Sequence, residues 1–168
     1  NASELVTVWA GFSTRWYGEL LRDEAFLDAA WVTLQVAVAS STIATVLGTM
    51  AAHVMVRAGR FWGRTLFSGM IYAPLVMPEV ITGLSLLLLF INIGLDRGIL
   101  TIILAHTTFS MCYVSVVVSA RLVSFDRALE EAALDLGCSP FEAFRLVTLP
   151  IILPAVISGW LLAFTLSL

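Results

Sequence analysis

The sequence contains no lysine, and its nine basic residues are all arginine. It therefore has no P-loop, because that ATP-binding motif uses a lysine to reach the β- and γ-phosphates. Charged residues of both signs make up only 12% of the chain, and the formal net charge is −3. Since proteins bind the phosphate backbone through an excess of basic side chains, we expect no nucleic-acid partner.

Cysteine and histidine are also scarce, with two of each in the chain. Cys112 lies in an apolar segment and Cys138 in a polar loop, so we expect no disulfide between them. His53 and His106 stand alone, without the spacing of metal ligands, and we expect both to pack between helices or at helix ends. The apolar segments also lack a Ser/His/Asp set and paired carboxylates. We therefore predict a chain that is not an enzyme and binds no metal or cofactor.

Apolar residues, in contrast, make up 60% of the chain, and the mean hydropathy is +0.97. Ordinary soluble domains are roughly 45–50% apolar and about 25% charged. Long apolar runs without period-two alternation favour helices that satisfy their own backbone hydrogen bonds in lipid. We predict an all-α membrane protein with a transmembrane domain at 29–168. Its expected spans are about 29–56, 66–93, 99–120 and 151–168.

The arginines predict which loops face the cytoplasm, because cytoplasmic loops carry an excess of basic residues. Arg57, Arg60 and Arg64 lie in or beside the first loop, which has no acidic residue. By alternation, the connection at 121–149 is also cytoplasmic, and residues 1–28 lie outside.

Residues 1–28 hold Trp9, Trp16 and Tyr17 among charged residues. Since aromatic rings favour the membrane–water boundary, we predict a partly helical interfacial segment. A docking surface for an external partner is the alternative. The chain begins at Asn1 without a recognisable signal peptide and ends inside an apolar run, so we expect a piece of a longer protein.

The cytoplasmic connection is predicted to start with a short amphipathic helix. Leu129, Ala132, Ala133 and Leu136 recur at i, i+3, i+4 and i+7, which places them on one face. Gly137 follows the last of them, where a left-handed residue commonly ends a helix.

A second short helix is predicted to begin after this glycine and to end at Pro150. Ser139 is a good N-cap, Pro140 suits the first helical position, and Glu142 stands three residues after the cap. The resulting helix–glycine–helix elbow has an exposed apolar face beside acidic residues, which suits insertion into a groove on a partner protein. A connector that packs on its own membrane helices is the alternative.

The second apolar segment contains two prolines, Pro74 and Pro78, which each remove a backbone donor and loosen the helix. Glu79 follows near the middle of the segment, where a carboxylate costs roughly 2.5–3.5 kcal/mol and is normally aimed at a polar cavity or a partner. A broken helix with an acid at the break predicts a cation site on a substrate pathway. Alternatively, Glu79 caps freed backbone groups or pairs with a neighbouring subunit.

Aromatic side chains in the apolar segments could contribute cation–π contacts to such a pathway. Packing between helices is the alternative for each. Tyr113 and Trp160 join Glu79 as the candidate pathway residues, and the further aromatic candidates are Tyr72 and Phe109.

The segment at 130–150 reads EEAALDLGCSPFEAFRLVTLP. It resembles the EAA loop of ABC-transporter permeases, with the pattern E-A-A-x3-G-x9-I-x-L-P, and Val147 stands where isoleucine is usual. In that family the loop sits in a groove of a cytoplasmic ATPase, and the resemblance implies that Glu131 and Gly137 are the main coupling residues. The matching residues are Glu131, Ala132, Ala133, Gly137, Leu149 and Pro150.

Longer stretches are similar to the permeases of bacterial polyamine importers, among them LVTVWAGFSTRWYGELLRD, APLVMPEVITGLSLLLLF and VISGWLLAFTLSL. The likeness covers essentially the whole chain, although Val32 stands where relatives often carry asparagine. It implies a partial type I ABC importer permease fold, with about four of the family's spanning helices, in a bacterial inner membrane. The implied partners are a second permease, two ATPase subunits that bind ATP–Mg, and a periplasmic polyamine-binding protein.

The expected function is thus that of a permease subunit in an ATP-driven polyamine importer, with putrescine as the most expected cargo. The alternative is a self-contained secondary transporter or channel for organic cations. That class would need no cytoplasmic elbow and would favour several charged residues within its helices.

Overall fold

The computed structural model describes residues 7, 9 and 11–168, which form helices and loops without strands. The predicted all-α class is therefore confirmed for this part of the chain. Contacts divide the chain into two compact units, 1–35 and 36–168. The helical elements are α1 (Arg15–Leu20), α2 (Glu24–Arg57), α3 (Arg64–Val76), α4 (Glu79–Asn92), α5 (Ile99–Ser124), α6 (Ala128–Asp135), α7 (Pro140–Ala143), the π-helical turn η1 (Phe144–Thr148) and α8 (Leu149–Ser167).

The first unit contains α1 and the start of α2. Asp23 caps α2, because its Oδ1 accepts hydrogen bonds from the backbone N–H groups of the next helical turn at 3.0 and 3.3 Å. The rings of Trp9 and Tyr17 are largely exposed. The expected partly helical character is confirmed, and the interfacial position stays a prediction. The rest of that prediction, at 1–6, 8 and 10, lies outside the described residues.

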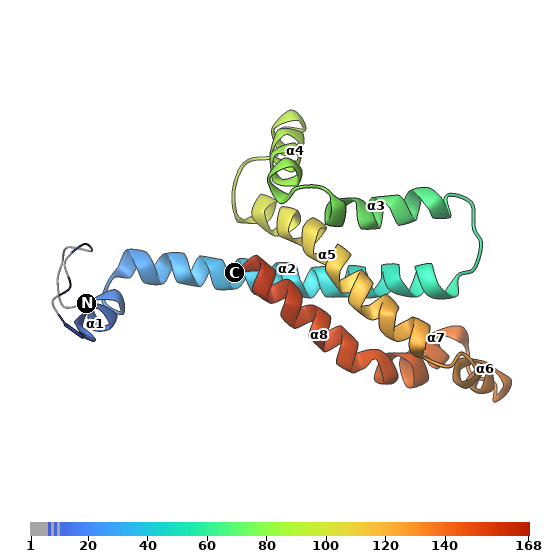
Figure 1. The fold of residues 1–168 in the computed structure, drawn as a ribbon. Helices are drawn as coiled ribbons and strands as arrows, with labels where there is room; N and C mark the ends of the chain where they lie inside the picture. Colours follow the sequence, from blue (N-terminus) through green and yellow to red (C-terminus); the bar gives the residue numbers. More distant parts are fainter. Residues whose placement is uncertain (1–6, 8, 10) are drawn as a thin grey trace. The chain divides into compact units, whose positions relative to one another are not determined.

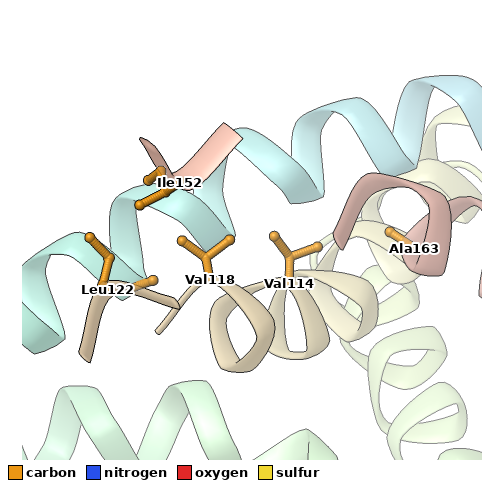
Figure 2. Close-up of a cluster of buried hydrophobic side chains, with 6 residues drawn as sticks. Val114, Val118, Leu122, Ile152 and Ala163 are labelled. Carbon is orange, nitrogen blue, oxygen red and sulfur yellow. The ribbon is translucent and has the colours of Figure 1, made fainter. Parts of the chain in front are cut away.

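The second unit is built on three long helices: α5, α8 and the part of α2 after residue 35. Figure 1 shows α5 and α8 packed side by side along their lengths. Their shared core is a cluster of fully buried apolar side chains, most of which Figure 2 shows. Because lipid is as apolar as these side chains, close packing holds such helices together. The cluster consists of Ala52, Val114, Val118, Leu122, Ile152 and Ala163.

Two glycines allow these helices to approach closely around Val114 of α5. A Cβ atom at Gly48 of α2 would lie 2.7 Å from the backbone oxygen of Met111 and 2.8 Å from Cβ of Val114. A Cβ atom at Gly159 of α8 would lie 3.2 Å from Cγ1 of Val114. Small residues at such crossings are typical of membrane helix packing.

Hydroxyl groups connect the same helices. Ser167 of α8 lies within hydrogen-bond distance of two side chains: its Oγ is 2.9 Å from Ser40 Oγ and 2.8 Å from His106 Nδ1. Nε1 of Trp160 donates to Oγ1 of Thr42 at 3.1 Å. The prediction that His106 packs between helices is thus confirmed.

Within the part of the chain that the structure describes, three helical stretches are long and apolar enough to cross a membrane: α2, α5 and the continuous stretch Pro140–Ser167. The predicted second segment, 66–93, consists of α3 and α4 with a bend of 118° between them, so the predicted break in this helix beside Glu79 is confirmed. The break lies at Met77 and Pro78, whose backbones are extended. The residue before a proline avoids the helical region, which explains the break. Pro74, in contrast, stays inside α3.

Candidate functional site: an elbow and a carboxylate-lined cavity

The elbow, residues 128–150, begins with α6 and turns at Gly137. The backbone φ of Gly137 is +93°, in the left-handed region. The N–H of Gly137 donates to the Leu134 oxygen at 3.0 Å, and the N–H of Cys138 donates to the Ala133 oxygen at 3.1 Å. This pair of bonds is a Schellman motif. The predicted glycine cap is confirmed.

The second arm of the elbow begins with a reciprocal cap. Oγ of Ser139 accepts from the N–H of Glu142 at 3.3 Å, and Oε2 of Glu142 accepts from the N–H of Ser139 at 2.8 Å. Pro140 occupies the first helical position. The backbone hydrogen bond from Ser139 favours the ionised carboxylate and so lowers the pKa of Glu142. The predicted start of this helix is confirmed.

The predicted end of this helix at Pro150 is wrong. The helix continues from α7 through η1 into α8 and also runs through Pro154. The N–H of Leu149 bonds to the oxygen of Phe144, five residues back, so the π-helical turn shifts the register. Pro150 then lies in the first turn of a new α-helical register, where its missing N–H costs little.

The predicted coupling residues are divided between the two sides of the elbow. Glu131 and Ala132 are exposed, and Oε1 of Glu131 lies 3.2 Å from Nε of Arg127 on its own helical turn. Ala133 is buried, so the prediction of one common exposed apolar face is wrong at this residue. The coupling role of all six motif residues stays a prediction. Among the remaining motif residues, Gly137 and Pro150 are exposed, and Leu149 packs against the buried cluster.

The outer side of the elbow carries large apolar side chains that are more than half exposed. They are Leu129, Leu136, Phe141 and Leu146. The inner side, with Ala133, Ala143 and Thr148, is buried. The elbow therefore packs on its own protein with one side, as the alternative expected, and leaves apolar surface uncovered on the other.

Sequence reasoning missed Glu130, which lies immediately before the motif. Its Oε2 is 2.8 Å from Nε of Arg57 at the end of α2, and both side chains are only 13% exposed. Its Oε1 accepts a hydrogen bond from Oγ1 of Thr148 at 2.6 Å. The available signal was its position three residues before Ala133, on the inward face of α6.

The contact between Glu130 and Arg57 is an ion pair without a hydrogen bond. Nε of Arg57 is among the buried polar atoms that make no hydrogen bond within the described part of the chain, although it lies 2.8 Å from the carboxylate. The guanidinium also lies over the ring of Phe125, 5.4 Å from its centroid. Because Arg57 and Glu130 meet, the first loop and the elbow lie on the same side, in agreement with the arginine rule.

A second candidate site is a cavity of about 260 Å³ between the start of α4, the middle of α5 and the end of α8. Glu79 lies on its wall as the first residue of α4, where the partial positive charge of a helix N-terminus favours a carboxylate. His106 and Phe109 of α5 lie on the opposite wall, and the remaining lining residues are Thr82, Gly83, Leu86, Ala105, Ser110 and Leu166.

The other two candidate pathway residues do not line this cavity. Tyr113 contacts one of its walls, because its ring packs edge-to-face on Phe109 with centroids 5.1 Å apart. Trp160 bonds Thr42 and stacks on Phe164 at 5.3 Å. The pathway role of Glu79, Tyr113 and Trp160 stays a prediction. The structure adds His106, which sequence reasoning treated only as a packing residue.

Residues 44–168 match the family described as "Binding-protein-dependent transport system inner membrane component". The chain belongs to this family. Together with its apolar helices, membership makes it a multi-pass inner-membrane protein, and its all-helical fold agrees with a partial type I permease.

Three relatives of this chain are named as polyamine permeases. The chain is 60% identical to the putrescine transport system permease protein PotI of Escherichia coli K12, over 100% of this chain and 62% of that protein. It is 40% identical to the spermidine/putrescine transport system permease protein PotC of the same strain, over 100% and 63%. Identity to PotC of Haemophilus influenzae is 41%, over 95% and 62%. The chain thus spans less than two thirds of the length of these relatives.

Proposed function

We propose that the chain is the membrane part of a permease subunit in an ATP-driven polyamine importer, with putrescine as its substrate. The 60% identity to a putrescine permease over the whole chain supports this assignment. In this proposal the chain forms half of the translocation pathway and pairs with a second permease. Two cytoplasmic ATPase subunits bind ATP–Mg and drive the cycle, and a periplasmic binding protein delivers the polyamine. The chain itself carries out no catalysis.

The observation that carries the coupling role is the two-sided geometry of the elbow. Its inner side is fixed to the ends of α2 and α8 through Glu130. Its outer side presents uncovered apolar residues and the exposed carboxylate of Glu131. An apolar helical surface flanked by a carboxylate suits a groove that offers apolar contacts and a basic side chain. A self-contained transporter has no use for such a surface.

The membrane helices leave room for the proposed second permease. Among the described residues, α3 buries only Ile71 and α4 buries only Phe90. The remaining apolar surface of these two helices is available to lipid and to a partner subunit. The cavity beside Glu79 opens within this region, so a second permease can complete its wall.

The native thiols provide a test of the proposed function. Cys138 follows the elbow glycine and is partly exposed, whereas Cys112 is buried. In the complete transporter in membrane vesicles, maleimide labelling of Cys138 is expected to slow several-fold when the ATPase subunits are bound. Putrescine uptake is expected to require ATP hydrolysis.

A Cys138→Ser variant measures labelling at other positions of the full-length chain. An Asp96→Cys variant reports on the opposite loop, where ATPase binding should change nothing. Uptake that continues without ATP hydrolysis would favour the secondary-transporter alternative. Unchanged labelling of Cys138 in the assembled complex would contradict docking through the elbow.

Glu79→Gln is expected to raise the apparent KM for putrescine by about tenfold, because one hydrogen bond to a charged group contributes roughly 1.5–3 kcal/mol. Glutamine keeps the size of the side chain and removes the charge that would face an ammonium group. The measurement is the initial uptake rate against putrescine concentration. Asp96→Asn, in the exposed loop after α4, is the matched control and should leave KM unchanged. If the KM of Glu79→Gln equals that of Asp96→Asn, Glu79 does not contact the substrate and serves only at the N-terminus of α4.

A further inference from the structure

One carboxylate in the elbow joins three separate elements. Glu130 lies in the first turn of α6, its Oε2 meets Arg57 at the end of α2, and its Oε1 meets Thr148 directly before α8. Thr148 is 1% exposed. The contacts are thus formed beneath the surface, where water competes less with them.

The surroundings of this junction continue into the rigid core of the second unit. The Arg57 guanidinium lies over Phe125, the buried residue that follows α5. Val56 and Leu149, the chain neighbours of Arg57 and Thr148, pack against the buried cluster that Figure 2 shows. Movement of the Glu130 carboxylate therefore reaches the ends of all three long helices through packed side chains, which is the physical requirement for coupling between sites.

The other paired carboxylates of the elbow make local contacts. Glu131 pairs with Arg127, four residues earlier, and both side chains are more than half exposed. Glu142 bonds Ser139 within the first turn of α7. Each of these contacts stabilises a single helical turn, and neither joins α6 to another element.

We propose that Glu130 is a positioning residue that locks α6 to the ends of α2 and α8, so that a displacement of the elbow moves both membrane helices as one body. The inference rests on the proposed coupling function of the elbow and adds the residue that transmits the motion. Glu131 lies on the outer side, where the partner would contact it, and Glu130 lies on the inner side. In this proposal Glu131 contacts the partner, and Glu130 transmits the motion of the elbow to the membrane helices.

The charge of Glu130 matters separately from its shape. Its contact with Arg57 is an ion pair without a hydrogen bond, so a neutral glutamine loses the attraction and leaves a buried, uncompensated guanidinium. The hydrogen bond from Thr148 requires only an acceptor oxygen, which glutamine retains. Glu130→Gln therefore removes the connection to α2, and Thr148→Val removes the connection to α8.

The test uses the complete transporter reconstituted in vesicles, with putrescine uptake and ATP hydrolysis measured in the same sample. Glu130→Gln is expected to lower the uptake per ATP hydrolysed by about tenfold, within the usual range of coupling between sites. ATP hydrolysis and protection of Cys138 are expected to persist, because the outer side of the elbow is unchanged. Thr148→Val is expected to lower uptake per ATP in the same direction.

Asp96→Asn, an exposed acid in the loop after α4 and outside the elbow, is the matched control and should keep the wild-type ratio. The double variant Arg57→Gln with Glu130→Gln leaves no unpaired charge, so its loss should be smaller than the sum of the two single losses. If Glu130→Gln does not accumulate, Thr148→Val gives the same readout with the ion pair intact.

Wild-type uptake per ATP in both Glu130→Gln and Thr148→Val would overturn the inference while the proposed function stands. A loss of uptake that only follows the amount of assembled complex would overturn it as well, since that is the signature of a structural role. If the wild-type transporter shows no ATP-dependent uptake, the proposed function fails and the inference fails with it.

Discussion

Gly48→Leu is expected to destabilise the purified subunit by about 1–3 kcal/mol, the usual cost of overpacking a tight contact. A Cβ atom at this position meets the Met111 backbone oxygen at 2.7 Å and Val114 at 2.8 Å. A backbone oxygen cannot rotate away as a flexible side chain can, so α2 and α5 have to separate. The separation disturbs the packing of Val114 against Ala52 and the rest of the buried cluster. Thermal unfolding in detergent, followed by circular dichroism, measures the loss.

Gly69→Leu is the matched control, because a Cβ atom at Gly69 of α3 meets nothing within 4 Å. Leucine is a better helix former than glycine by up to about 1 kcal/mol, so this variant should be unchanged or slightly more stable. Val114→Ala in the Gly48→Leu background should recover only part of the loss, since the clash with the Met111 oxygen remains. Equal melting temperatures for Gly48→Leu and Gly69→Leu would show that α2 and α5 are not in close contact at this crossing.

Gly137→Val is expected to reduce polyamine uptake by at least about tenfold, which corresponds to roughly 1.4 kcal/mol. The φ of +93° suits glycine and is a strained conformation for a β-branched residue. Valine would therefore shift the backbone toward negative φ and break the two Schellman bonds that end α6. The angle between α6 and α7 then changes, and the elbow no longer presents its outer residues together. Uptake in vesicles of the complete transporter measures this effect.

Two controls separate the shape of the elbow from backbone strain in general. Gly137→Asn should retain most activity, because asparagine tolerates the left-handed region. Gly94→Val introduces a similar strain at φ +73° in the loop after α4, outside the elbow. It should lower stability while uptake per assembled complex stays near wild type. If Gly137→Val transports normally once assembled, the turn is not needed for coupling.

The helices of the second unit could be predicted because their signals are local. Long apolar runs place α2, α5 and α8 within a few residues of their observed limits. The caps at Gly137 and Ser139 were also predictable, since each depends on residues at most five positions away. Local chemistry determines these features almost alone.

The features that were missed depend on register or on distant contacts. Pro150 predicted a helix end. The π-helical turn before it instead places Pro150 in the first turn of α8, where the lack of a backbone N–H breaks no hydrogen bond. The break beside Glu79 was predicted, but the sequence did not show that Pro78 breaks the helix while Pro74 stays inside it. Glu130 gained its role from Arg57, which lies on another helix, so no short window of sequence contains both partners.

The hydroxyl groups between α2, α5 and α8 have a consequence for how these helices can move. Ser40, Ser41 and Thr45 each donate to a carbonyl of their own helix, three or four residues back. Such groups remain satisfied in an apolar environment even when the neighbouring helix changes its position. The contact of Ser40 with Ser167 therefore adds little resistance to a small shift, and the buried cluster and the Glu130 contacts are what hold α2 and α8 together.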